Sequence, residues 1–278
     1  MTQDDPRPAP GALDVARVRT HHLHEAKRRG EKFTMLTCYD ALTAEIFDGA
    51  GVDVLLVGDS AGNNVLGYAT TLPVTVDELL PLCRAVAGAA GRALVVVDLP
   101  FGSYEASPGQ AVATAVCFLK EGGAHAVKLE GGAWCAPHVE AMVRAGVPVV
   151  GHIGFTPQSE HALGGYRVQG RGDAARELVE DARGLEAAGA FCVLMEMVPA
   201  EAAAAVDAAL GVPTVGIGAG AGTTGQVLVW QDMLGLRRGR VPRFVRRYAD
   251  LHGVVAEAVG RYAEDVRSGT FPGPEHSF

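Results

Sequence analysis

Six short apolar runs in this chain each carry, or are followed by, a residue that can do chemistry. They are VDVLLVG before Asp59 and Ser60, ALVVV before Asp98, AVKLE with Lys128 and Glu130, VPVVG before His152, FCVLM before Glu196, and PTVGIG ending at Gly218. Runs that are apolar throughout are typical of parallel strands buried on both faces of a sheet. In a β/α barrel the carboxyl ends of all strands meet at one face, where the active site is built. The sequence therefore predicts that these side chains share one pocket.

Asp59 and Asp98 are predicted to bind a divalent cation. Each follows at least four apolar residues, where a buried charge is costly unless it is paired or bound to a metal. Two carboxylates, completed by water and substrate oxygens, are a common way of holding Mg²⁺. The alternative is a helix N-cap or a loop salt bridge. The residues that follow, Ser60-Ala61-Gly62 and Leu99-Pro100, do not open a clear helix, so metal ligation is favoured.

Lys128 and Glu130 alternate along one run, so both side chains point to the same side of the predicted strand. The chain has only four lysines among its 24 basic residues. A lysine inside an apolar strand therefore suggests a need for a compact point charge, which the planar arginine head does not supply. A buried ion pair between Lys128 and Glu130 is the simpler interpretation, and it is compatible with a place in the site.

Glu196 and His152 are predicted to take part in the chemistry of the same pocket. Among apolar neighbours the pKa of Glu196 should be raised, which suits a general base near neutral pH. Its alternative role, in the first turn of a helix that follows Pro199, would need it three residues later in the chain. His152 is interpreted as a substrate contact, against the alternative of a hydrogen-bonded structural histidine.

Three other motifs could each mark a functional site, and for each the sequence also offers a simpler interpretation. Residues 220–225 match G-x-G-x-x-G, but a predicted strand follows them, so a dinucleotide site is rejected in favour of a loop whose backbone approaches a ligand. The loop Thr156–Gly172 is either a mobile lid or a plain connection. The histidines at positions 21, 22 and 24 are interpreted as surface residues rather than a zinc site.

Strands and helices alternate along the chain and are predicted to position these residues. The expected strands are Phe33–Cys38, Val54–Val57, 93–97, 126–129, 147–151, 191–195, 213–217 and Gln226–Trp230. This alternation indicates a parallel sheet, and eight strands favour a closed (β/α)8 TIM barrel over an open doubly wound sheet. Residues 1–13 are expected to be a disordered tail. Residues 14–270 are expected to form one catalytic domain with a C-terminal helical extension near 242–270.

Helix starts are marked by capping residues. Asp40 is the predicted N-cap of a helix over 41–50, and Thr75 with Glu78 forms a capping box. Ser107 is predicted to open another helix, with Pro108 in its first position and Gln110 closing the box. Further helices are expected over 173–188 and 200–210.

Composition excludes several classes of function. The 278 residues are 48% hydrophobic and 20% charged, with a net charge of -8 and a pI of about 5.6, so a nucleic-acid-binding domain is not expected. The arginines between 237 and 247 are interpreted as a solvated helix face or a subunit contact. Neither a signal peptide nor a membrane span is predicted. The five cysteines are expected to be free thiols, which places the protein in the cytoplasm.

Long motifs in this order resemble the ketopantoate hydroxymethyltransferase family. They are VGDSAGNNVLGYATTLPVTVDE, VDLPFGSYEASPGQA, AVKLEGG, GHIGFTPQS, GGYRVQGRG, MEMVP and GIGAGAGTTGQVLV, and the resemblance covers residues 14–262. It implies a barrel of the phosphoenolpyruvate-mutase-like group, bound Mg²⁺, and homo-oligomers that are commonly decamers. It also implies transfer of a hydroxymethyl group from 5,10-methylenetetrahydrofolate to 3-methyl-2-oxobutanoate, giving 2-dehydropantoate for pantothenate synthesis.

The resemblance also implies roles for individual residues. Asp59 and Asp98 resemble metal ligands that also contact the substrate, and Glu130 resembles a residue that meets the metal directly or through water. Ser60 and Lys128 resemble substrate contacts, and Glu196 resembles the base. The implied mechanism is chelation of the 2-oxo acid by Mg²⁺, removal of a proton by Glu196, and attack of the enolate on the one-carbon unit.

Two positions depart from the family pattern. Thr224 stands where Asp is usual, and Gln231 stands where His is usual. Both lie outside the predicted metal and base positions, so they bear on loop support or the folate side. Two other functions are kept as alternatives: a Mg²⁺-dependent C–C lyase that acts on a 2-oxo or 2-hydroxy acid, and a non-catalytic assembly protein.

Overall fold

Eight parallel strands close into a barrel, as predicted. The computed structural model describes residues 13–239 and 241–278. The strands pair in the order β1 to β8, and β8 returns to β1. They are β1 Phe33–Thr37, β2 Val54–Val57, β3 Leu94–Asp98, β4 Ala126–Glu130, β5 Val149–Gly154, β6 Cys192–Glu196, β7 Thr214–Ile217 and β8 Gly225–Leu228. The closed barrel excludes the open doubly wound sheet.

The pairing register of the strands places the predicted residues side by side across neighbouring strands. Asp98 of β3 is opposite Lys128 of β4, and Glu130 of β4 is opposite His152 of β5. Glu196 is the last residue of β6, the next strand around the barrel. Each of these residues lies at or near the carboxyl end of its strand. This is the face on which barrels build their sites.

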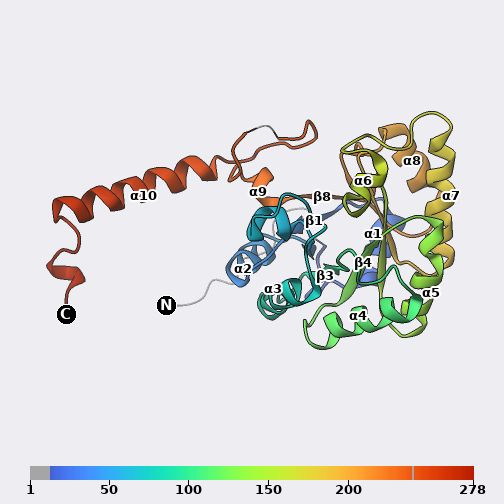
Figure 1. The fold of residues 1–278 in the computed structure, drawn as a ribbon, viewed down its shortest axis with the longest axis horizontal. Coiled ribbons are helices and arrows are strands. Elements are labelled where there is room, and N and C mark those ends of the chain that lie inside the picture. Colours follow the sequence, from blue (N-terminus) through green and yellow to red (C-terminus); the bar gives the residue numbers. More distant parts are fainter. Residues whose placement is uncertain (1–12, 240) are drawn as a thin grey trace. The chain divides into compact units, whose positions relative to one another are not determined.

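Helices surround the strands (Figure 1). They are α1 Thr20–Arg29, α2 Ala41–Gly49, α3 Val76–Ala89, α4 Pro108–Lys120, α5 Ala136–Arg144, α6 Glu160–Leu163, α7 Ala174–Ala187 and α8 Ala200–Ala209. A π-helix over Gly62–Leu66 and 3-10 turns over Ala133–Cys135 and Pro157–Ser159 lie in the connections. The apolar core consists of strand side chains and the inner faces of these helices.

A second compact unit begins at Val229, after the barrel unit that ends at Leu228. It contains α9 Trp230–Met233 and α10 Leu251–Ser268. The predicted C-terminal helix is confirmed, but its expected start near residue 242 is wrong. Asp250 caps α10 by accepting a hydrogen bond from the Gly253 amide, and residues 242–250 are not helical. The described arginines of this stretch, Arg237, Arg238, Arg243, Arg246 and Arg247, therefore do not form a helix face, and Arg240 lies outside the described residues.

The predicted caps are confirmed with one exception. Asp40 accepts a hydrogen bond from the Thr43 amide, and Thr75 and Glu78 form the reciprocal capping box. Ser107 caps α4 by accepting from the Gln110 amide. The side chain of Gln110 does not close this box, because its oxygen accepts from the Ala106 amide and its nitrogen donates to the Gly102 carbonyl.

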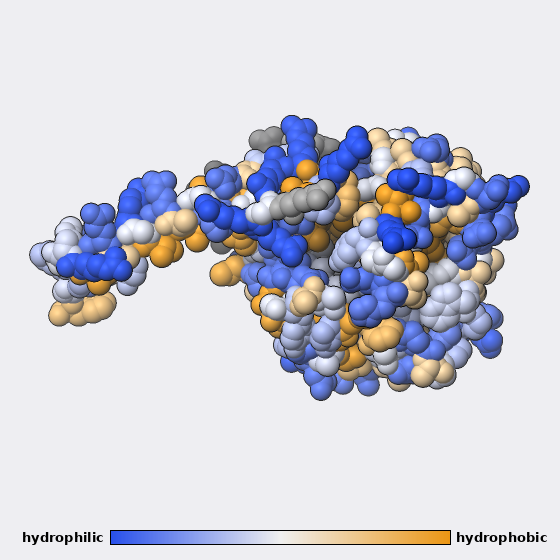
Figure 2. Space-filling view, turned by 45° about the horizontal axis from the view of Figure 1, so that its top comes forward, coloured by the Kyte–Doolittle hydropathy of each residue, from blue (hydrophilic) through white to orange (hydrophobic). Residues whose placement is uncertain are grey.

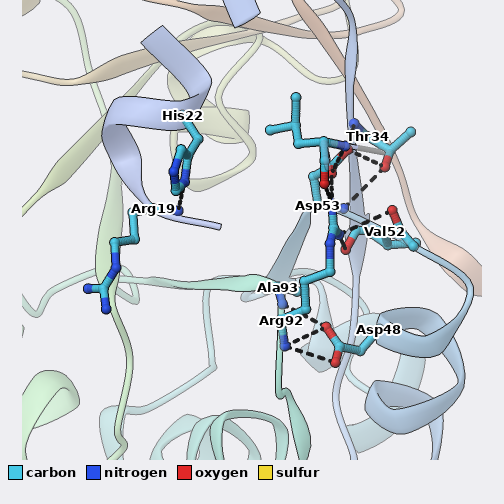
Figure 3. A network of polar contacts seen from close by, with 10 residues as sticks. Arg19, His22, Thr34, Asp48, Val52, Asp53, Arg92 and Ala93 are labelled. Atoms are coloured by element: carbon cyan, nitrogen blue, oxygen red, sulfur yellow. Dashed lines mark hydrogen bonds and ion pairs between the residues drawn. The ribbon is translucent and has the colours of Figure 1, made fainter. Parts of the chain in front are cut away.

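Two aspartates, of which Asp53 is buried and Asp48 is half-buried, hold the strand starts at the amino-terminal end of the barrel (Figure 3). Asp53 precedes β2 and is fully buried, and its carboxylate accepts hydrogen bonds from the Leu13 and Thr34 amides and pairs with Arg92 at 2.7 Å. Asp48 accepts from the backbone amides that enter β3, including that of Ala93 at 2.6 Å. Charge-assisted bonds of this kind fix the strand starts, at the pole opposite the predicted site.

The glycine-rich connection between β7 and β8 packs against a helix. A Cβ atom on Gly220 would lie 2.5 Å from the Ala200 Cβ of α8, and one on Gly222 would lie 2.9 Å from the Ala204 Cβ. These two glycines therefore allow the close approach of α8, and the approach of this loop to a ligand stays a prediction. Thr224 hydrogen-bonds Asp207 at 3.0 Å, which is loop support. Strand β8 starts at Gly225, and Trp230 begins α9 rather than ending the strand.

The surface mixes polar and apolar residues on the visible face of the barrel (Figure 2), as is usual for folded proteins. The predicted tail of residues 1–13 lies outside the described residues except for Leu13, which is buried. In the described part of the chain, no helix has the length and apolarity needed to cross a bilayer. All five cysteines are free thiols.

Candidate active site

The barrel brings together every charged residue that the sequence places in the site. Asp59 and Ser60 follow β2, and the others lie on β3 to β6. Asp59, Asp98, Lys128, Glu130 and His152 are between 2% and 4% exposed, and Glu196 is partly buried. We call Asp59, Asp98, Glu130 and Glu196 the carboxylate cluster. So many ionisable groups at one buried place are typical of a functional site.

Lys128 is the cation at the centre of the cluster. Its Nζ lies 2.9 Å from Asp98 Oδ1, 3.1 Å from His152 Nδ1 and 3.9 Å from Glu130 Oε1. Burial alone would lower the pKa of Lys128, but Asp98, Glu130 and Asp59 outweigh it and raise that pKa. The lysine therefore stays charged. Lys128 lies near Glu130, as the ion-pair interpretation expected, and it also lies within the carboxylate cluster.

Asp59 and Asp98 are direct neighbours. Asp98 Oδ2 accepts a 2.9 Å hydrogen bond from the backbone amide of Asp59. Burial raises the pKa of Asp59 well above its usual value, and the charges of Asp98 and Glu130 add to this effect. Two carboxylates this close repel one another unless a proton or a cation lies between them.

The charge balance of the cluster fits a divalent cation. Four carboxylates face one ammonium group, and burial followed by the charge of Lys128 lowers the pKa of His152 well below 6.5, so the histidine adds no charge. The donor set fits oxygen coordination, because hard cations bind carboxylates and complete their shell with water. In the described ranges, no three His, Cys, Asp or Glu side chains converge as ligands.

Glu130 has its own partners, which bear on the metal role expected for it. Its Oε2 accepts a 2.9 Å hydrogen bond from the Gln158 amide, and its Oε1 lies 3.3 Å from His152 Nδ1. Burial raises the pKa of Glu130 to about 7. Asp98 is held in a similar way, since its Oδ1 pairs with Lys128 and its Oδ2 accepts from the Asp59 amide.

His152 connects Lys128 with Glu196. Its Nδ1 faces the Lys128 ammonium group, which can only donate, so we assign Nδ1 as the acceptor and place the ring proton on Nε2. That nitrogen lies 3.5 Å from Glu196 Oε2. Burial raises the pKa of Glu196 to about 8, and the charge of Glu130 adds to it. This agrees with the raised pKa expected from the sequence.

The backbone holds Glu196 in a constrained turn. Its carbonyl accepts from the Phe155 amide at 2.8 Å, and a Cβ on Gly154 would lie only 2.4 Å from that carbonyl oxygen. Met197 has φ of 48°, and it is the only non-glycine residue with a positive φ among the described residues. Such a conformation costs free energy and often occurs at functional sites.

Three further residues contact the predicted site residues and were not predicted from the sequence. Tyr39 contacts Ser60, with 2.8 Å between the two hydroxyl oxygens. Gln158 donates from Nε2 to Asp59 Oδ2 at 2.9 Å, and its Oε1 lies 2.7 Å from the Tyr104 hydroxyl. All three are buried and follow apolar stretches, where a tyrosine or an amide is readily interpreted as core. The available signals were that Gln158 lies in the motif GHIGFTPQS and Tyr104 in the motif VDLPFGSYEASPGQA.

A cavity of about 700 Å³ lies elsewhere, beside α1, and shares no residue with the site. Its lining mixes both signs of charge, and Arg29 pairs with Glu31 at 3.1 Å within it. No group that lines it is buried without a partner. We therefore place the chemistry at the carboxylate cluster, where charges are buried and their pKa values are shifted.

Comparisons with known proteins identify relatives over nearly the whole chain. The family model for ketopantoate hydroxymethyltransferase matches residues 17–274. The 3-methyl-2-oxobutanoate hydroxymethyltransferase of Paenarthrobacter aurescens (strain TC1) is 70% identical, covering 97% of this chain and 90% of the relative. The protein of the same name from Leifsonia xyli subsp. xyli (strain CTCB07) is 61% identical, covering 98% and 99%.

Solved structures share the fold at low sequence identity. A phosphonopyruvate hydrolase in complex with oxalate and Mg²⁺ superposes with a TM-score of 0.59 at 16% identity, covering 93% of each chain. A 2,3-dimethylmalate lyase of the phosphoenolpyruvate mutase and isocitrate lyase superfamily gives 0.58 at 17% identity, covering 92% of each chain. These likenesses support the barrel architecture and no specific reaction.

Proposed function

Because the chain belongs to the ketopantoate hydroxymethyltransferase family, we propose that it transfers a hydroxymethyl group from 5,10-methylenetetrahydrofolate to 3-methyl-2-oxobutanoate. The product is 2-dehydropantoate, a precursor in pantothenate synthesis, and water supplies the hydroxyl oxygen. The observation that carries the proposal is the position of Glu196, a partly buried carboxylate of raised pKa, beside Lys128, His152 and the aspartate pair.

Glu196 is the proposed base. It removes the proton from the carbon next to the ketone of the 2-oxo acid, and a pKa of about 8 makes it strong enough to do so near neutral pH. In the described part of the chain, His152 Nε2 is buried without a hydrogen-bond partner, and it lies 3.5 Å from Glu196 Oε2. The resulting enolate attacks the one-carbon unit that the folate delivers.

Lys128 and Ser60 are proposed to hold the acid end of the substrate. The Lys128 ammonium attracts the carboxylate, and Ser60 is fixed by the Tyr39 hydroxyl. Asp59 and Asp98 would hold Mg²⁺, with Glu130 acting through water, and His152 adds a substrate contact. When bound, Mg²⁺ supplies Lewis-acid polarisation of the ketone, which is worth several kcal/mol.

The proposed function is tested by measuring 2-dehydropantoate formation by the purified protein. Product is expected only when the 2-oxo acid, the folate and Mg²⁺ are all present. In the absence of folate, the protein is expected to exchange the proton on the branched carbon for deuterium from D₂O. Consumption of the 2-oxo acid without folate would instead indicate a C–C lyase. Failure to bind or exchange it at all would indicate a non-catalytic protein.

We also propose that the protein is a cytoplasmic homo-oligomer, and a decamer by its resemblance to the family. Helix α10 supports self-association, because Val255, Val259, Tyr262 and Val266 repeat at helical spacing on one face and are exposed. Light scattering coupled to size-exclusion chromatography measures the mass directly. A monomeric mass at micromolar concentration would contradict this assembly.

A further inference from the structure

Gln158 uses every hydrogen-bonding group of its side chain inside the site. Its Nε2 donates to Asp59 Oδ2 at 2.9 Å and to the Leu99 carbonyl at 3.0 Å, and its Oε1 accepts from the Tyr104 hydroxyl at 2.7 Å. The Leu99 carbonyl can only accept, so the amide nitrogen must face it and the orientation of the amide is unambiguous. A side chain with this pattern cannot be replaced by an acid or an apolar group without leaving a buried partner unpaired.

The backbone of Gln158 contacts a second carboxylate of the cluster. Its amide donates to Glu130 Oε2 at 2.9 Å, while its side chain donates to Asp59. Gln158 therefore binds both Asp59, which is expected to hold the cation, and Glu130, which is expected to hold a water molecule of that cation. The connection after β5 thereby sets how far apart these two carboxylates lie.

Tyr104 in turn supports Gln158. Its hydroxyl lies 2.7 Å from the Gln158 Oε1 and 2.9 Å from the Glu130 carbonyl oxygen, and its side chain is buried. The hydroxyl has a single proton, and the shorter contact assigns that proton to Gln158. Tyr104 contacts neither Asp59 nor the carboxylate of Glu130, but its hydroxyl also accepts from the Glu130 amide at 3.3 Å, so it supports the Glu130 backbone as well as the Gln158 side chain.

We propose that Gln158 is a positioning residue of the metal site, which turns Asp59 into the site and fixes its separation from Glu130. This inference rests on the proposed function, since it requires that the cluster binds a divalent cation. Outer partners of metal ligands are worth about 10- to 100-fold in metal affinity. Gln158 touches neither the substrate nor the reacting atoms in this role, so its effect appears first in metal affinity.

The test measures binding of Mn²⁺, a spectroscopic replacement for Mg²⁺ at oxygen ligands. Free Mn²⁺ is titrated by electron paramagnetic resonance in the wild-type protein and in Gln158→Met, which keeps the length of the side chain but has no donor. We expect Gln158→Met to bind Mn²⁺ about 10- to 100-fold more weakly. Gln169→Met is the matched control, because its amide nitrogen donates only to the exposed Arg167 carbonyl. It should leave the affinity unchanged.

The outcomes separate this inference from the proposed function. If the wild-type protein itself binds no Mn²⁺, the metal assigned under the proposed function is wrong. If the wild type binds Mn²⁺ and Gln158→Met binds it equally well, the positioning role is overturned. Circular dichroism and thermal melting establish that each variant is folded. Should Gln158→Met fail to fold, Tyr104→Phe removes the proton that orients the amide, and an unchanged Mn²⁺ affinity in that variant likewise overturns the proposal.

Discussion

At the scale of single residues, Asp59 and Asp98 are the residues expected to bind the metal ion. Their replacement by Asn removes one negative charge but keeps the volume, so the loss is chemical rather than steric. We expect Asp59→Asn and Asp98→Asn each to lose Mg²⁺-dependent deuterium exchange into 3-methyl-2-oxobutanoate by more than about 100-fold, beyond the range for outer partners. Asp173→Asn is the control, because its carboxylate is exposed before α7. Exchange at the wild-type rate would remove both residues from the metal site.

Glu196 is predicted to act in proton removal and not in binding. A glutamine keeps the size and some hydrogen-bonding capacity of the side chain but cannot take up a proton. Glu196→Gln should therefore bind metal and 2-oxo acid normally while exchange slows by about 100- to 10,000-fold. Isothermal titration of the 2-oxo acid separates the two effects, and the exposed Glu201→Gln serves as control. An unchanged exchange rate would reassign the base.

The constrained turn after Glu196 gives a prediction at Met197. A β-branched side chain is disfavoured at φ of 48°, whereas glycine adopts it freely. Met197→Val should be less stable than Met197→Gly by about 1–2 kcal/mol, because only valine strains this backbone. Chemical denaturation of both variants measures the difference. Equal stabilities would mean that the backbone relaxes without cost.

Sequence reasoning found the charged members of the site and Ser60, but it missed the neutral residues Tyr39, Tyr104 and Gln158. Asp98 and Glu196 stand out because a charge at the end of an apolar run needs an explanation. Gln158 and Tyr39 are uncharged, and their function lies in partners that are far away in the chain, such as Asp59 for Gln158. Contacts of this kind depend on the closure of the barrel, which no local pattern records.

At the scale of elements, the capping box of α3 predicts a stability effect without loss of activity. Thr75 Oγ1 accepts from the Glu78 amide, and removing an N-cap hydroxyl costs about 1 kcal/mol. Thr75→Ala should lower the melting temperature by about 2–4 °C, whereas Thr75→Ser should keep it. Differential scanning calorimetry tests the pair. A melting temperature that is the same in both variants would show that the cap is not needed.

Strands were predicted better than helices and turns. Continuous apolar runs identify six of the eight strands closely. Strand β5 starts two residues and ends three residues later than expected, because it continues through His152 to Gly154, and β8 ends two residues earlier than expected, before α9 begins at Trp230. Helix α1 was missed, since its sequence THHLHEAKRR buries only Leu23 and Ala26. The packing of α8 against the glycine-rich connection was not predicted, because the same glycines suit a ligand or a neighbouring helix. Only the fold shows that α8 lies against them.

At the scale of the whole molecule, the buried negative charge couples stability to pH. Glu130 and Glu196 have pKa values of about 7 and about 8 in the folded protein, above the ordinary 4.5. Groups of raised pKa stabilise the fold while protonated and lose that contribution as pH rises through the folded value. His152 has the opposite sign, but above pH 6.5 it is neutral in both states. Metal-free protein should therefore become less stable from pH 6.5 to 8.5.

The size of this effect follows from the same shifts. A loss of about 2 kcal/mol over this window corresponds to a fall in melting temperature of about 4–8 °C. Mg²⁺ should reverse it, and should raise the melting temperature more at pH 8.5 than at pH 6.5, because a cation replaces the lost protons. Thermal melts with EDTA and with saturating Mg²⁺ measure both. A metal-free melting temperature that is flat or rises with pH would contradict the assignment.

The salt-linked aspartate below β2 has an implication for how this enzyme tolerates change. Asp53 binds Leu13, Thr34 and Arg92 at the end of the barrel opposite the carboxylate cluster. Damage there would shorten the lifetime of the molecule while leaving each surviving copy fully competent. A screen that measures the activity of freshly purified protein would not detect such variants. They would be detected only by measuring the activity that remains after storage or heating. The contacts of Asp53 that stabilise the fold and the carboxylate cluster thus lie at opposite ends of the barrel. Thermal stability and activity can therefore be engineered separately.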